Sequence, residues 1–257
     1  MKRPLYPLYK DSRIKWMGEI PSHWETRRLG VLGRFSSSGI DKKIVEGKPL
    51  VNMINYMDVY KNRTHLLDSK EQYMIVSCSK SRIHKHQVQK GDLIFLPSSE
   101  TLEDLGLSAL VDEDLPNTVF SYHVIRFQFS TEICHEFKKY LCNNHSVLNQ
   151  FSSEGKGTTR QIVGKTVFRN IKVVLPSKQE QHAIATFLNH KTTPIDALIA
   201  KNEHQTEVQD KIRAAFIDNI ITKGFNPDVP MKDSGIEWLG EIPKHWAVVR
   251  SKVVFNE

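Results

Sequence analysis

The chain has 257 residues, of which 39% are hydrophobic and 25% are charged, and its formal net charge is +7. This length allows one sizeable hydrophobic core, and the absence of 18 consecutive apolar residues argues against a helix that spans a membrane. Three cysteines form no paired framework, and the N-terminus lacks the apolar run of a signal peptide. We therefore expect a cytoplasmic protein.

The positive charge is concentrated in the first two thirds of the chain. Residues 1–176 hold 26 Lys and Arg against 18 Asp and Glu, which gives +8. Residues 177–257 hold 10 against 11, which gives −1, and the two parts sum to the net +7. This distribution predicts a polyanionic partner for the first part and a protein partner for the second.

In chain order, alternating or apolar runs predict strands over residues 27–35 and 50–56, a turn at 58–63, and a strand or a helix end over 73–76. A polar loop at 36–43 carries two neighbouring lysines, Lys42 and Lys43. The densest basic run of the chain has no acidic residue and contains Lys80, Arg82, Lys85 and Lys90.

The next part of the chain contains several short strands followed by a helix. Strands are predicted at 91–97, after a Gly-Asp turn, and at 107–111 and 119–129. A helix is expected over 132–151, and a strand over 171–175 follows a flexible loop at 152–161. Short strands followed by a helix, without regular β-α-β alternation, predict an α+β domain.

A long helical region begins after this domain. Ser177 and Glu180 have the spacing of a capping box and predict a short helix over roughly 178–190. Thr193-Pro194 is a start signal, so a second helix is expected from Pro194 to about Thr222, ending before Gly224. At ~1.5 Å per residue this second helix would be about 43 Å long.

The second helix carries a heptad-spaced seam, apolar at its ends and polar in its middle. Polar residues at such positions can fix register and partner. Packing on the helix's own domain is the alternative use of the same face. The seam consists of Ile195, Leu198, Asn202, Gln205, Gln209, Ile212 and Phe216.

The end of the chain repeats its beginning. Residues 232–246 repeat eleven residues of segment 10–24 in register, including both tryptophans. Such self-similarity indicates that one structural unit has ended and a second has begun. We expect Trp16 and Trp24 and their copies, Trp238 and Trp246, to be packing anchors.

Catalytic and cofactor motifs are not found in the sequence. Neither a dinucleotide-binding fingerprint nor a phosphate-binding loop is present, and two Glu-Gly-Lys matches to half of a nuclease motif lack the preceding Pro-Asp. Cys134, His135, Cys142 and His145 do not have zinc-site spacing. We therefore expect a binding subunit with no catalytic residues and no metal site.

Several motifs together resemble the specificity subunit of type I restriction–modification enzymes. They are Trp16-x-Gly-x-Ile-Pro-x-x-Trp24, Gly91-Asp92-Leu93-Ile94-Phe95, Gly157-Thr158-Thr159-Arg160, Leu175-Pro176 with Glu180-Gln181 and Ile184-Ala185, Ile195-Asp196 and Thr222-Lys223-Gly224. The resemblance covers nearly the whole chain.

The resemblance implies a non-catalytic subunit that recognises an interrupted site in double-stranded DNA. It also implies methyltransferase (M) subunits as partners, together with the restriction (R) subunit, while S-adenosylmethionine, ATP and magnesium bind those partners. The chain would divide into a target-recognition domain (1–176), a conserved helical spacer (177–224) and the start of a second repeat (225–257).

This sequence has one recognition domain where the family usually has two. Half-length subunits of the family pair head-to-tail, and a truncated product or an exchangeable cassette are the other interpretations. An adaptor or decoy that binds the methyltransferase without reading DNA is the alternative function, and a nuclease or methyltransferase is a third class that the missing motifs oppose.

Candidate contact residues follow from the chemistry of DNA recognition, in which Lys, Arg and hydroxyls contact phosphates while Arg, Asn and Gln read bases. The alternative for each group is a solvated surface. The DNA-binding candidates are Lys80, Arg82, Lys85 and Lys90; Lys156, Thr158, Thr159, Arg160 and Gln161; and Lys42 and Lys43. The candidate dimer or partner interface consists of the heptad seam together with Trp238 and Trp246.

Overall fold

The computed structural model describes residues 6–251, and the extreme termini, on which the expectation about a leader partly rests, lie outside that range. Contacts between residues divide the chain into two compact units, Met1–Thr193 and Pro194–Glu257. The three-part division of the chain stays a prediction. No helix in the described part of the chain is long and apolar enough to cross a membrane.

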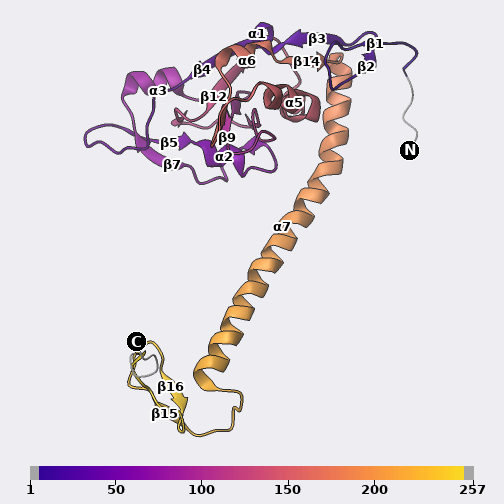
Figure 1. Cartoon of the computed structure of the whole chain (residues 1–257). Coiled ribbons are helices and arrows are strands. Elements are labelled where there is room, and N and C mark those ends of the chain that lie inside the picture. Colours follow the sequence, from indigo (N-terminus) through magenta and orange to yellow (C-terminus); the bar gives the residue numbers. More distant parts are fainter. Residues whose placement is uncertain (1–5, 252–257) are drawn as a thin grey trace. The chain divides into compact units, whose positions relative to one another are not determined.

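A five-stranded mixed sheet forms the centre of the first unit (Figure 1). Its strand pairs are antiparallel except for β10–β6, which is parallel. In order across the sheet, the strands are β4 (Gly33–Ser37), β12 (Ile125–Phe129), β8 (Leu93–Phe95), β10 (Ser108–Val111) and β6 (Leu66–Leu67).

Both faces of this sheet are buried. Successive side chains of a strand point to opposite faces, so neighbouring residues enter different hydrophobic clusters. On β8, Leu93 and Phe95 enter one hydrophobic cluster, whereas Ile94 enters another. The first cluster also contains Phe127 and Phe168, with the Phe95 and Phe168 ring centroids 5.5 Å apart. Helices α4 (Phe137–Asn143), α5 (His145–Glu154) and α6 (Lys165–Asn170) contribute to this cluster.

The opposite cluster is closed by a second, three-stranded sheet and two short helices. Ile54 and Phe120 bring this sheet into the second cluster. Its strands are β11 (Thr118–Phe120), β5 (Leu50–Ile54) and β7 (Met74–Ser77), and the helices are α2 (Tyr56–Tyr60) and α3 (Lys80–His86). A small strand pair, β9 (Ser98–Ser99) with β13 (Gln161–Ile162), holds the loop before α6.

The predicted strand over 27–35 is wrong, because one helical turn interrupts it. Strand β3 (Glu25–Arg28) pairs with β14 (Lys172–Leu175), helix α1 (Leu29–Leu32) follows, and β4 then begins at Gly33. A Cβ at Gly33 would lie 2.2 Å from the carbonyl oxygen of Gln128. The turn therefore brings the backbone closer to β12 than a residue with a side chain would allow.

Three other expectations are corrected by local hydrogen bonding. The turn predicted at 58–63 overlaps the last three residues of helix α2 and is a turn only beyond Tyr60; the Asp58 carboxylate caps this helix by accepting from the Asn55 N–H at 2.7 Å. The strand over 119–129 breaks at Ser121, whose hydroxyl accepts from the His123 N–H. The helix over 132–151 divides at Asn144, which caps α5 by accepting from the Val147 N–H at 3.1 Å.

Helix α7 (Lys178–Lys223) is continuous through Pro194, so the prediction of two helices is wrong. The capping box is confirmed, since the Ser177 N–H donates to the Glu180 carboxylate at 3.0 Å. The predicted end is also confirmed, because Gly224 follows with φ +81°. Pro lacks an N–H and normally interrupts a helix; here both Pro194 and His190, whose carbonyl loses its i+4 donor, are exposed residues.

The apolar ends of the seam on α7 are exposed in the described chain. The exposed fractions are 56% for Ile195, 58% for Leu198 and 63% for both Ile212 and Phe216. Exposed apolar residues at heptad spacing are typical of a helix that packs against a partner. The long helix with this spacing fits a coiled coil.

A small hairpin occurs twice, once in each unit. In the first unit, β1 (Tyr9–Asp11) pairs with β2 (Glu19–Pro21). In the second unit, β15 (Met231–Asp233) pairs with β16 (Glu241–Pro243) in the same register. The sequence repeat is therefore also a structural repeat.

Candidate nucleic-acid interface

The loop that carries Lys42 and Lys43 is fixed at its base and exposed at its tip. The Ser38 hydroxyl donates to the carbonyl of Phe120, and Ile40 is fully buried. The N–H of Lys42 donates to the Asp41 carboxylate at 2.7 Å, while both lysine side chains are exposed. The two lysines therefore extend from an anchored loop.

The basic run 80–90 does not act as one group, because most of it is wound into α3. Arg82 points toward the Lys42 loop and donates through Nη1 to the carbonyl of Gly39 at 3.3 Å. Lys90 lies beyond the helix, where it interacts electrostatically with Glu113. Lys80 and Lys85 are exposed on α3, so Arg82 is the member of the run that the structure brings to the loop.

A buried arginine fixes the far end of α3. Arg126 on β12 donates through Nη1 to the carbonyl of Gln87 at 2.6 Å, and its Nη1 lies 3.9 Å from the Asp92 carboxylate. Burial raises the pKa of Asp92 and lowers the pKa of Arg126. Arg126 therefore holds α3 in place from within the protein.

The Gly-Thr-Thr-Arg loop is a tight turn that presents Arg160. At Gly157, φ is +147°, and a Cβ would lie 2.0 Å from the Arg160 carbonyl oxygen. The backbones of Lys156 and Ile162 exchange two hydrogen bonds across the loop. Gln161 donates back to the Gly157 carbonyl at 3.0 Å, whereas Lys156, Thr158 and Thr159 are exposed.

Arg160 is held in place by two contacts. Its Nε donates to the Ser98 hydroxyl at 3.0 Å, and its guanidinium carbon lies 4.9 Å from the centroid of the Tyr56 ring. Tyr56 in turn stacks on Tyr60 with a centroid separation of 5.4 Å. Arginine over an aromatic face is stabilised electrostatically and loses mobility.

Two of the three predicted groups meet at one hollow of about 390 Å³, which both Lys42 and Arg160 line. Burial lowers the pKa of His123 in the same hollow, and Lys42 and Arg160 lower it further, so this imidazole is biased toward its neutral form. The remaining lining includes the amide of Asn55 and one acid, Glu100.

The Lys42 loop separates this hollow from a neighbouring one of about 290 Å³. Lys43, Lys48 and Arg82 line the second hollow. The structure therefore brings Lys42, Lys43, Arg82 and Arg160 to one loop face, which we call the basic loop face. Lys48, His123 and Tyr56 belong to this face and were not predicted from the sequence, although Lys48 follows Lys42 and Lys43 closely in the chain.

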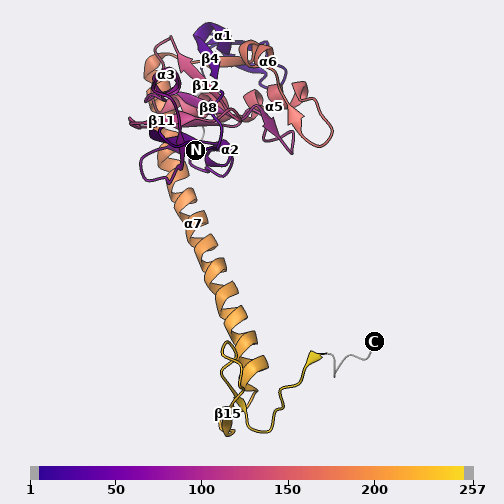
Figure 2. The ribbon, with the colours of Figure 1, turned by 90° about the vertical axis from the view of Figure 1, so that its left-hand side faces the viewer.

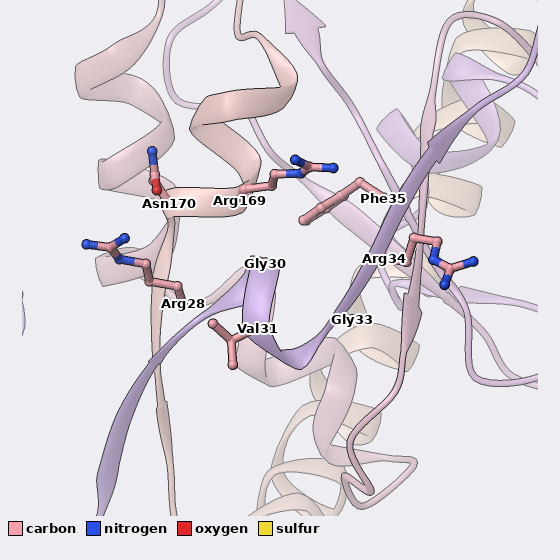
Figure 3. Close-up of a pocket in the computed structure, with 8 residues that line it drawn as sticks. All are labelled: Arg28, Gly30, Val31, Gly33, Arg34, Phe35, Arg169 and Asn170. Atoms are coloured by element: carbon pink, nitrogen blue, oxygen red, sulfur yellow. The ribbon is translucent and has the colours of Figure 1, made fainter.

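A third hollow, of about 470 Å³, lies between α1, β4 and α6 and was not predicted from the sequence (Figure 3). We call it the second basic hollow, because it lies apart from the two hollows of the basic loop face. Its lining includes the side chains of Arg28, Arg34 and Arg169 and contains no acidic residue. Figures 1 and 2 both place α1 and α6 at one end of the domain and α2 at the other. This hollow is therefore separate from the basic loop face.

The cysteines and histidines of the α4–α5 region, whose spacing does not predict a zinc site, have different surroundings in the structure. Cys142 is fully buried, and His135 contacts Asp112 at 2.9 Å. Within residues 6–251, the possible metal ligands Cys134, Glu136 and His182 do lie close together, with ligand atoms within 4.8 Å. The Cys134 thiol donates to Glu136 at 3.2 Å, and burial raises its pKa, which disfavours the thiolate that metals bind.

Solved structures show the class of fold. The S subunit HsdS of Thermoanaerobacter tengcongensis superposes with a TM-score of 0.50 at 12% identity, covering 80% of this chain and 46% of that one. A structure described as showing complex assembly and conformational transition of the type I R-M system gives a TM-score of 0.55 at 15% identity, covering 80% and 47%. The predicted α+β domain followed by a long helix is confirmed by this fold.

The chain belongs to the family of type I restriction modification DNA specificity domains, whose model matches residues 21–207. The MjaVIII specificity subunit of Methanocaldococcus jannaschii is 26% identical over 96% of this chain and 53% of its own length. The putative MjaX specificity subunit of the same organism is 25% identical, over 95% and 56%. The chain thus spans about half the length of these curated relatives and carries a single recognition domain.

Proposed function

We propose that this chain is a sequence-recognition subunit of a type I restriction–modification complex. It binds double-stranded DNA and directs methyltransferase and nuclease subunits to an interrupted site. The chain itself contributes no catalytic group. S-adenosylmethionine, ATP and magnesium bind to the partner subunits instead. These assignments rest on family membership together with the basic loop face.

One observation carries the proposal most directly: cationic side chains from three separate segments converge on one face. Lys42, Arg82 and Arg160 are far apart in sequence, yet they come together around two hollows with aromatic and amide groups. Phosphates are bound by such cations, and base edges are read by arginine and amide side chains. An adaptor that does not read DNA has no need of this arrangement.

The test is a titration of the chain with duplex DNA over a series of salt concentrations. Each phosphate neutralised contributes about −0.9 to the slope of log K against log salt concentration. Several contacts from the basic loop face therefore predict a slope of several units. A flat salt dependence would support the adaptor function instead.

The absence of chemistry in the isolated chain is tested separately. Purified chain incubated with DNA and S-adenosylmethionine alone is expected to leave the DNA unmodified. Methylation that persists when the chain is purified away from any methyltransferase subunit would contradict the proposed role.

A further inference from the structure

The two hairpins of the chain have the same internal structure. We call residues 9–24 the N-terminal hairpin and residues 231–246 the C-terminal hairpin. Both pair their strands in one register, and the N–H of Ser12 donates to Gly18 at 3.0 Å as the N–H of Ser234 donates to Gly240 at 3.0 Å. The Ser12 hydroxyl accepts from the Ile14 N–H at 3.1 Å, and the Ser234 hydroxyl accepts from the Ile236 N–H at 3.1 Å.

The N-terminal hairpin is bound by a defined set of residues on its own domain, which we call the Glu180 socket: Ser146, Lys172, Val174 and Glu180. Figure 1 shows β1 and β2 beside β14 and the first turns of α7. The Trp24 indole N–H donates to the Glu180 carboxylate at 3.1 Å, and Nε2 of His23 lies 3.0 Å from the same carboxylate. This carboxylate also caps α7, so the hairpin binds at the helix N-terminus.

The other contacts of the socket involve apolar packing and main-chain oxygens. Ile14 and Ile20 pack against Val174. Lys172 donates to the carbonyl of Arg13 at 3.1 Å, and Ser146 donates to the carbonyl of Trp16 at 3.1 Å. Neither of these two hydrogen bonds depends on the side chain of the hairpin residue that accepts it.

The C-terminal hairpin retains the hydrogen-bonding groups and the two isoleucines that the socket contacts, and Leu239 stands in place of Met17 in the apolar packing. His245 and Trp246 stand where His23 and Trp24 stand in the first copy, and Ile236 and Ile242 replace Ile14 and Ile20. Gly235 takes the place of Arg13, and Lys244 takes the place of Ser22. Neither difference removes a main-chain oxygen. The second hairpin is therefore chemically equivalent to the first at each contact.

The second hairpin is less covered than the first. Ser12 and Ile14 are buried, whereas Ser234 and Ile236 are only partly buried, and Trp238 is 84% exposed against 38% for Trp16. Among the described residues, no hydrogen bond from the Trp246 indole is found, although the ring lies beside Gly224 at the end of α7. In the part of the chain that the structure describes, the Trp246 indole therefore does not bind a carboxylate as the Trp24 indole binds Glu180.

We propose that the C-terminal hairpin binds the Glu180 socket of a second copy of this chain, in exchange with that copy's own N-terminal hairpin. The match of donors, apolar residues and register is the reason for choosing this occupant. Exchange of equivalent elements between copies is a known route to dimers. The proposal is independent of DNA binding, because none of these residues belongs to the basic loop face.

The direct test uses a fluorescent peptide of residues 229–247 and two forms of the whole chain. Wild-type chain, whose socket is filled, should bind the peptide weakly, and His23→Ala or Trp24→Ala should bind it at least about tenfold more tightly because the resident hairpin is weakened. Peptide that carries Trp246→Ala should not bind these variants more tightly than wild type. The tighter binding should also be lost when Glu180→Gln is added to the His23→Ala chain. Circular dichroism checks that each variant is folded, and His23→Ala is the milder change if Trp24→Ala disturbs the domain.

The second arm measures oligomeric state by light scattering. His23→Ala should strengthen self-association relative to wild type, and adding Trp246→Ala should reverse the effect. Equal peptide binding by wild-type and His23→Ala chain would overturn the match between hairpin and socket. Tight peptide binding without any change in self-association would overturn the choice of a second copy as the partner.

Discussion

Arg160 illustrates how a surface cation can be positioned for recognition. Its Nε donates to Ser98 and its guanidinium lies over Tyr56, so it loses less freedom on binding than an unrestrained side chain. Arg82 is similarly tethered, through Gly39. Lys90, of the same basic run, contacts neither hollow and interacts with Glu113.

The first prediction compares these three residues. Arg160→Ala and Arg82→Ala should weaken DNA binding, by about 1–3 kcal/mol if the side chain reads a base and with a reduced salt slope if it contacts a phosphate. Lys90→Ala is the matched control and should change affinity little. Titration of each variant with the same duplex checks this, and an equal loss for all three variants would show that no distinct basic loop face exists.

The second prediction concerns Glu180. Partial burial would raise its pKa, but hydrogen bonds from Ser177, Trp24 and His23 outweigh this effect and lower the pKa from 4.5 to about 2. Because the folded pKa is lower than the ordinary value, Glu180 contributes stability that is present above about pH 4.5. This contribution is lost as the pH falls toward 2.

The attachment of the N-terminal hairpin should therefore weaken on acidification in this window. The fluorescence of a variant that retains only Trp24, with the other three tryptophans changed to Phe, reports on the attachment. The same variant with Glu180→Gln should lack the transition. A transition of equal size in the Gln variant would assign it to other carboxylates.

At the residue scale, the sequence was informative about which segments matter and less so about individual contacts. The groups at 42–43 and 156–161 do meet in space, and their assignment to DNA stays a prediction. The separation of Arg82 from Lys90 could not be foreseen, because it depends on where α3 ends against Arg126. The arginines of the second basic hollow were missed because they belong to three different elements.

At the scale of elements, the errors of prediction have local causes. Polar residues at 55, 121 and 144 cap or break elements through hydrogen bonds, and their patterns were present in the sequence but were outweighed by the apolar periodicity. Pro194 is the opposite case, since a strong breaker lies within a continuous helix. The strands that were predicted as apolar runs between turns, such as β5, β8, β10 and β14, are confirmed, and the segment left open as a strand or a helix end is strand β7.

The third prediction follows from Pro194. Proline in a helix interior removes a hydrogen bond and clashes with the preceding turn, at a cost of about 3 kcal/mol. Pro194→Ala should therefore stabilise α7 locally. Hydrogen exchange of the amides around residues 190–200 should slow in this variant, whereas the exposed replacement Thr193→Ala should have little effect. Unchanged exchange in Pro194→Ala would mean that the helix is already fully formed at this point.

At the scale of the whole molecule, we expect two copies to pair through the heptad seam of α7 with antiparallel helices. The exposed Ile212 and Phe216 are apolar ends of the seam, and Asn202, Gln205 and Gln209 in its middle would set the register. Phe216→Asp should prevent pairing because it places a charge in an apolar contact. Asp210→Ala, outside the seam, is the control.

Light scattering decides this fourth prediction. A wild-type chain that is monomeric over the accessible concentration range would contradict the two-copy assembly. Deletion of residues 231–257 should weaken pairing while the recognition domain stays folded. An unchanged dimer after this deletion would remove the C-terminal hairpin from the interface.

Pairing of identical recognition domains by two-fold symmetry implies an inverted-repeat DNA site. The part of α7 from Pro194 to Thr222 is about 43 Å long at ~1.5 Å per residue, a little over one turn of DNA, so the half-sites would lie on the order of 12 base pairs apart. The target bases themselves depend on the geometry of loops such as 155–161 on bound DNA.

The central claim is that this chain selects the DNA sequence on which its partners act. Sequencing of methylated positions in cells that carry the chain and its methyltransferase partner tests it most directly. We predict methylation at one interrupted, inverted-repeat motif that requires the chain and is weakened or altered by Arg160→Ala. The same methylation motif in cells that lack the chain would contradict the claim.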